Sequence, residues 1–202
     1  MEFGRTPEDI ERNRKAFLIA LYAWAGAAFL VPLGSYSLVS GRLLLGLTLL
    51  ANAAMVLGTM WYSRVTHRVK GPSLLFSVQT GLLAAFLALD GGIEGSGVYF
   101  SFPLVLMMVM LGFTRLWMSA LQSAIVLLIV ALGLYLGFPG VHDYPAVHKT
   151  RLLMGLAALS LMTMIIEWLR VSSYAAITHT AELLHVDASH DSPDGLDESA
   201  RL

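Results

Sequence analysis

The chain has 202 residues, of which 56% are hydrophobic and 13% are charged, and its formal net charge is −1. One soluble core cannot bury that much apolar surface, so the composition predicts an integral membrane protein. The small net charge argues against a nucleic-acid-binding domain, which needs a basic face. The absence of cysteine excludes disulfides, thiolate metal sites and cysteine nucleophiles.

Six apolar runs follow one another along the chain, each close to the roughly 20 residues that a helix needs to cross a bilayer. They predict an all-α bundle of six transmembrane helices. The expected spans are residues 16–39, 43–62, 72–89, 98–113, 116–138 and 152–169. The first run has no small-residue cleavage site, so we expect a retained helix and not a signal peptide.

Lys and Arg residues divide unequally between the connections. With the N-terminus in the cytoplasm, ten lie on the cytoplasmic side and only Arg42, Lys149 and Arg151 lie on the other. Because cytoplasmic loops carry the excess of these residues, we expect both termini to be cytoplasmic. The basic inner rim would favour anionic headgroups, so membrane lipids are expected partners.

The two ends of the chain differ in character from the transmembrane domain, which is expected over 16–170. Residues 1–15 are polar and predict a cytoplasmic N-terminal segment. Residues 171–188 remain helix-compatible, with a short heptad-like stripe, and predict a signalling stalk helix. Residues 189–202 turn polar and predict a flexible tail.

The glycine-rich segment 90–104 is the most distinctive stretch, with two carboxylates, three aromatic residues and a proline. One interpretation is a short outer loop with interfacial aromatics. The other is that its glycines let the backbone fold into the outer mouth of the bundle and form part of a ligand pocket. The candidate ligand-binding residues are then Asp90, Glu94, Tyr99, Phe100, Phe102, Pro103 and Met107.

An ionisable residue inside a span is a functional hypothesis by default, and Glu167 in the sixth span is the best example. It either pairs with Arg170 or Arg115, or it forms a polar contact that changes when the helix moves. In the second case Glu167, Trp168 and Arg170 relay a signal into the stalk. Polar side chains at Asn52 and Gln79 are expected to bond across helices.

Metal and catalytic sites find little support in the sequence. His142, Asp143 and His148 share one connection, but their spacing matches no helical ligand pair, so an exposed loop is expected. No histidine lies in any span, and neither an HExxH motif nor a glycine-rich phosphate loop is present. We therefore expect no catalytic domain, no metal and no cofactor.

A family resemblance adds to these patterns. The glycine-rich loop 90–97, the aromatic and proline residues 99–103 and the Leu-Gly-Phe-Thr-Arg segment 111–115 resemble the six-helix MASE-like sensor domains of bacterial diguanylate cyclases and some histidine kinases. The tail is similar to the segment that opens a GGDEF cyclase domain. Four residues match that segment, namely His190, Asp191, Gly195 and Leu196, and three depart from it, namely Pro193, Asp194 and Glu198.

The resemblance implies a sensory domain in the bacterial inner membrane that forms a homodimer. It would bind an outer-side or lipid-like ligand and relay binding through the sixth helix to a cytoplasmic output domain, with cyclic-di-GMP synthesis as the implied output. A histidine-kinase phosphoacceptor box at 189–191 is an alternative, although the Arg-Thr-Pro pattern of that box does not follow.

Two other functions stay open. A small transporter would need polar or charged groups at the bilayer midplane. A membrane anchor without a ligand would lack a concave polar-lined cavity that opens outward, whereas a sensor would have one.

Overall fold

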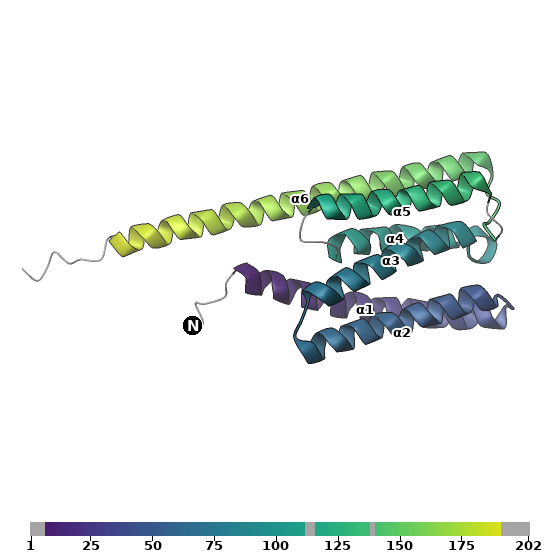
Figure 1. The fold of residues 1–202 in the computed structure, drawn as a ribbon, viewed down its shortest axis with the longest axis horizontal. Helices are drawn as coiled ribbons and strands as arrows, with labels where there is room; N and C mark the ends of the chain where they lie inside the picture. The colour runs from purple at the N-terminus through teal and green to yellow at the C-terminus, as the bar shows by residue number, and fades with distance from the viewer. Residues whose placement is uncertain (1–6, 112–115, 138–139, 191–202) are drawn as a thin grey trace, which may run out of the picture. The chain divides into compact units, whose positions relative to one another are not determined.

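The computed structural model describes the backbone of residues 7–111, 116–137 and 140–190 (Figure 1), and within these ranges the side chains of 12–173 apart from that of Glu94. The elements in chain order are α1 (Pro7–Val39), α2 (Leu43–Thr66), α3 (Lys70–Asp90), the short 3-10 helix η1 (Ile93–Gly95), α4 (Gly97–Leu111), α5 (Leu116–Leu136) and α6 (Ala146–His190). No strand occurs within the described ranges, so the all-α class is confirmed there.

Five helices in the described part of the chain are long and apolar enough to cross a membrane, namely α1, α2, α3, α5 and α6. This number supports a multi-pass membrane protein, but it is one fewer than the six expected spans. The missing span is α4, which has 15 residues and is therefore about 22 Å long. The hydrocarbon core is about 30 Å thick, so the described part of α4 does not span it by itself, and the sixth crossing stays a prediction.

Three helices begin earlier than their apolar runs. Residues 7–15, expected as a separate polar segment, continue α1, which starts at Pro7 because proline suits the first helical position. Pro72, expected as the first residue of the third span, lies in the first turn of α3, where its missing N–H is not needed. Helix α6 starts at Ala146 and not near 152. In each case the apolar run marks the part of the helix suited to lipid and not its ends.

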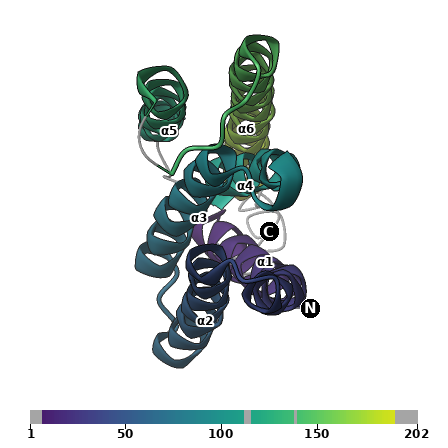
Figure 2. The same ribbon diagram turned by 90° about the vertical axis from the view of Figure 1, so that its right-hand side faces the viewer.

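Helix α3 lies at the centre of the bundle in the unit formed by residues 1–165, against α2, α4 and α5 (Figure 2). Small and polar side chains make this possible. Ser77 donates a 2.7 Å hydrogen bond to the carbonyl of Met108 on α4 and a 3.0 Å bond to Gln122 on α5. Gln79 donates to the backbone and side-chain oxygens of Asn52 on α2 at 3.0 and 2.9 Å, which confirms the predicted bond between these helices.

Helices α1 and α2 form a close antiparallel pair. They approach each other at two glycines, and a Cβ at Gly46 would lie 2.9 Å from the carbonyl oxygen of Gly34. Such small residues let helix backbones meet inside a membrane. Because the pair is antiparallel, the start of α1 lies beside the end of α2, and the end of α1 lies beside the start of α2. A cavity is found at each of these two ends.

A second unit comprises residues 166–202. Its described part is the continuation of α6, which runs without interruption to His190 and so includes the residues of the expected stalk. Arg170 Nε donates a 2.8 Å hydrogen bond to Glu167, so the expected pairing of these two residues is confirmed. Trp168 is exposed. Arg115 lies outside the described residues.

Candidate functional site

A cavity of about 390 Å³ lies between α1, α2, the end of α3, the η1 turn and α4. Its volume falls in the range of small-molecule sites, about 300–1,000 Å³. The lining residues from α1 and α2 are Ala25, Gly26, Phe29, Leu30, Leu33, Ser37, Leu45 and Leu49. Those from the end of α3 onward are Leu87, Gly92, Ile93, Ser96, Gly97, Tyr99, Phe100, Pro103, Leu104 and Met107.

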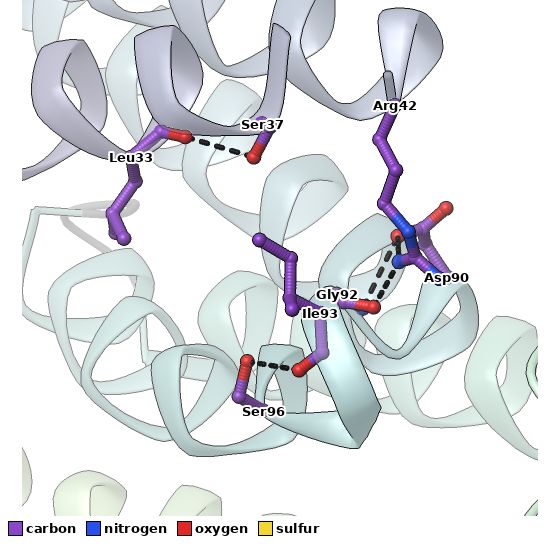
Figure 3. Close-up of polar contacts among 7 residues, drawn as sticks. All are labelled: Leu33, Ser37, Arg42, Asp90, Gly92, Ile93 and Ser96. Atoms are coloured by element: carbon purple, nitrogen blue, oxygen red, sulfur yellow. Dashed lines mark hydrogen bonds and ion pairs between the residues drawn. The ribbon is translucent and has the colours of Figure 1, made fainter. Parts of the chain in front are cut away.

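The lining is almost wholly apolar. Among the described lining residues, the side chains that carry polar atoms are Ser37, Ser96 and Tyr99. The two serines donate their hydroxyl protons to nearby backbone carbonyls, at 2.8 Å to Leu33 and 2.6 Å to Ile93. Figure 3 shows these two pairs on opposite sides of the site, on α1 and on the η1 turn. The walls therefore provide mainly shape and apolar contact, and both serine hydroxyls already donate to the backbone.

The turn that closes one end of the cavity depends on glycine. Gly92 has φ +61° and ψ −153°, a conformation that is essentially open to glycine alone. A Cβ on Gly92 would lie 2.7 Å from the backbone nitrogen of Gly97. The backbone N–H of Gly97 donates to the carbonyl of Gly91 at 2.9 Å, which holds the turn against the start of α4.

An ion pair fastens the same turn to the α1–α2 connection. Arg42 precedes α2, lies 3.7 Å from Asp90 at the end of α3 and donates a hydrogen bond to the carbonyl of Gly92 (Figure 3). The Asp90 carboxylate also accepts a 3.1 Å hydrogen bond from the Gly92 N–H. One arginine thus connects the two segments that border the cavity, and charge-assisted hydrogen bonds of this kind are among the stronger ones in proteins.

The connection between α5 and α6 packs against this turn. His142 donates its backbone N–H to the carbonyl of Leu89 at 2.8 Å, and its ring meets that of Tyr144 edge to face with 4.6 Å between centroids. The Tyr144 hydroxyl is buried and has no hydrogen-bond partner among the described residues. Burial, and to a lesser degree the charge of Asp90, raises the pKa of Tyr144 to about 12.

The structure brings four of the seven candidate ligand-binding residues to the cavity. Tyr99, Pro103 and Met107 are four residues apart and share one face of α4, and Phe100 lies beside them. Their role in binding stays a prediction.

The other three candidates do not line the cavity in the described part of the chain. Phe102 lies on another face of α4, where its ring would contact a Cβ at Gly155 of α6 at 2.9 Å. Asp90 belongs to the ion pair with Arg42. The side chain of Glu94 lies outside the described residues.

About half of the cavity lining consists of residues that were not predicted from the sequence. Phe29 and Leu33 on α1 and Leu45 and Leu49 on α2 look like ordinary lipid-facing or core residues in a linear sequence. The sequence offered one sign of this wall, namely Arg42. It is a single cation between two apolar runs, and the glycine-rich loop further along the chain carries the acidic residue Asp90.

The candidate metal residues have different surroundings. Asp143 is exposed and lies 3.6 Å from Lys149, and His142 packs on the glycine turn. Within the described ranges no three His, Asp or Glu side chains gather closely enough to hold a metal ion.

Comparison with known proteins adds no relative: no protein-family model, no curated protein and no solved structure matches this chain.

Proposed function

We propose that this chain is the membrane-embedded ligand-binding domain of a signalling protein, and that a lipid-like or small apolar molecule occupies the cavity between α1, α2 and α4. The cavity itself is the observation that carries the proposal. A bundle that served only as an anchor would gain stability by closing such a space, because voids in a packed interior forfeit contact energy.

The chemistry of the walls restricts the ligand. A volume of about 390 Å³ holds on the order of a dozen heavy atoms, at the roughly 30 Å³ that a water molecule occupies in the liquid. Both serine hydroxyls donate elsewhere, so apart from the Tyr99 hydroxyl the lining side chains offer a polar ligand little to replace its hydrogen bonds to water. The sequence led us to expect a polar-lined cavity for a sensor. The apolar lining instead favours the lipid-like ligand over a polar outer-side one.

Helix α4 provides a physical route from the cavity to α6. One face carries Tyr99, Pro103 and Met107 at the cavity, while Phe102 on another face lies against Gly155 of α6. Pro103 cannot donate to the carbonyl of Tyr99, which weakens the helix beside the ligand. A ligand that bends or straightens α4 there would move the Phe102 ring against α6.

The remaining parts of the proposal extend beyond the cavity. In this proposal α4 completes a sixth membrane crossing, both termini are cytoplasmic, and the domain lies in a bacterial inner membrane. The continuation of α6 carries the signal to an output domain, with Glu167, Trp168 and Arg170 at its start, and the protein is a homodimer. These features are supported by the uneven distribution of Lys and Arg and by the resemblance to MASE-like domains.

A transporter has less support. The polar side chains of α3 are engaged with α2, α4 and α5 through Gln79 and Ser77. They therefore act between helices and do not line the cavity.

Native mass spectrometry of the 202-residue chain in mild detergent tests this proposal. We expect a dimer that retains a defined apolar molecule. In the Gly26→Phe variant the new ring fills the cavity, and its Cβ is tolerated because the nearest atom would be Val56 Cγ1 at 3.9 Å. This variant should lose the bound molecule.

Gly58→Phe is the matched control, because it makes the same change on α2 at a site where no atom lies within 4 Å of the Cβ. It should keep the ligand. Leu33→Trp is a second filling variant in case Gly26→Phe does not fold. Equal retention in the filling and control variants, or a wild-type protein without any defined adduct, would refute the cavity as a ligand site.

A further inference from the structure

A second cavity, of about 440 Å³, lies where the start of α1 meets the end of α2. Its polar edge is formed by Arg12 and Asn13 of α1 and by Arg64 and His67 at the end of α2. With Ser63 of α2, five polar side chains converge on one cavity, and three of them are basic in character. This differs from the first cavity, which has no basic residue in its lining.

The floor of the second cavity is apolar. It consists of Ala16, Ile19 and Ala20 on α1 with Met60 and Val69 on the α2 side. A single cavity therefore offers cationic and hydrogen-bonding groups at its edge and hydrocarbon contact below. This combination matches an amphiphile with an anionic head and an apolar tail, because guanidinium groups bind phosphate oxygens in a planar, bidentate geometry.

The position of the cavity along the helices agrees with that occupant. The apolar run of α1 begins at Ala16, directly after the polar residues 12–15, so the polar edge of the cavity falls where lipid headgroups lie. Residues 60–70 contain three Arg or Lys residues and no carboxylate. A cation near a helix C-terminus also balances the helix dipole, but this does not explain why Arg12 of α1 joins the same cavity.

The backbone of His67 is a second, independent sign of function. His67 has φ +53° and is the one non-glycine residue with positive φ in the described part of the chain. Glycine adopts this left-handed conformation without strain at a helix end, and a histidine does not. Ser63 donates a 3.1 Å hydrogen bond to the carbonyl of Arg68 and helps to hold the turn. The imidazole is thus kept at the cavity edge although a glycine would fit the backbone better.

We infer that this cavity is a binding site for one anionic phospholipid, with the headgroup phosphate on Arg12, Arg64 and His67 and the first part of an acyl chain on the apolar floor. The inference is independent of the ligand proposed for the first cavity.

The test uses the purified full chain in detergent, with phosphatidylglycerol and phosphatidylcholine as probes in native mass spectrometry. Arg64→Gln should weaken phosphatidylglycerol binding about tenfold, the loss expected for one charge-assisted hydrogen bond, with little effect on phosphatidylcholine. Arg68→Gln is the matched control: Arg68 is exposed at the same end but does not line the cavity. It should change binding less than twofold.

His67→Gly separates binding from stability, because glycine relieves the strained backbone. It should weaken phosphatidylglycerol binding while the Tm stays the same or rises, and unchanged affinity in this variant would remove His67 from the site and overturn the inference. Equal losses in Arg64→Gln and Arg68→Gln would also overturn it, since they would indicate diffuse surface attraction. Inorganic phosphate at millimolar concentration should not displace the lipid, and full displacement would identify free phosphate as the occupant instead.

Discussion

The two cavities at opposite ends of the α1–α2 pair have similar volumes, about 390 and 440 Å³, and contrasting chemistry. The described lining of the cavity beside α4 is apolar apart from Ser37, Ser96 and the Tyr99 hydroxyl, and both serines donate to backbone carbonyls. The other carries Arg12, Arg64 and His67 above an apolar floor. The same helix pair thus creates both spaces, and the residues that line each one decide what it can hold.

The two ends also differ in how they are closed. The cavity beside α4 is bordered by a glycine turn that Arg42 and Asp90 fasten through side-chain contacts. At the other end the turn after α2 contains His67 in the left-handed conformation and is held by the hydrogen bond from Ser63 to the Arg68 carbonyl. Substitutions that disrupt one cavity and leave the other intact therefore test the difference between the two ends most directly.

The largest effect is expected for Gly92→Ala. The new methyl group would meet the backbone of Gly97 at 2.7 Å in a conformation that alanine avoids. We expect the free energy of unfolding to fall by about 3 kcal/mol, from strain and overpacking together. Retention of the apolar molecule should be lost, whereas phosphatidylglycerol binding at the far cavity should persist. Thermal unfolding and native mass spectrometry measure both.

Gly41→Ala provides the control for this change. Gly41 also has a positive φ, +81°, but no atom lies within 4 Å of its Cβ position. Its cost should be limited to backbone strain, about 1–2 kcal/mol, with the apolar molecule retained. Equal effects of the two substitutions would contradict the importance that we assign to the packed Gly92–Gly97 turn.

A smaller effect is expected at Tyr144. Its pKa is raised from 10.0 to about 12 in the folded protein, so the folded state favours the protonated phenol. The associated stability is fully present below pH 10 and is lost as the pH rises toward 12. Tm measured across this range should decline for this reason in the wild type but not in Tyr144→Phe.

At neutral pH the Tyr144→Phe substitution should change the free energy of unfolding by less than about 1 kcal/mol. The buried hydroxyl has no hydrogen-bond partner among the described residues, so its removal breaks no hydrogen bond seen there. A large loss of stability at pH 7 would mean that the hydroxyl has a partner essential to the loop.

Much of the fold could be predicted from hydrophobic runs. The start of α2 at Leu43 was predicted, because the charged residue Arg42 precedes the apolar run. The ends of helices were less predictable, since helices α1 and α6 continue through polar residues beyond the lipid. The fourth span was expected over 98–113 as the shortest of the six, and the described helix α4 has 15 residues, so a sixth crossing stays a prediction.

The candidate site was only half predictable for a related reason. The residues on α4 form a linear motif, and the spacing of Tyr99, Pro103 and Met107 alone places them on one face. The same four-residue spacing does not include Phe102, so it could have been left out of this face. The opposite wall was not accessible from the sequence, because it depends on which faces of α1 and α2 meet at Gly34 and Gly46.

Photolabelling tests the central claim, that the cavity beside α4 holds an apolar molecule, most directly. The probe is an uncharged long-chain alcohol with a diazirine in its chain, and adducts are located by peptide mass spectrometry in the wild type and in Gly26→Phe. We predict adducts concentrated at Phe29, Leu33 and Tyr99 that disappear in the variant. Adducts spread over exposed, lipid-facing positions such as Trp61 and Leu128, and unchanged in the variant, would contradict the claim.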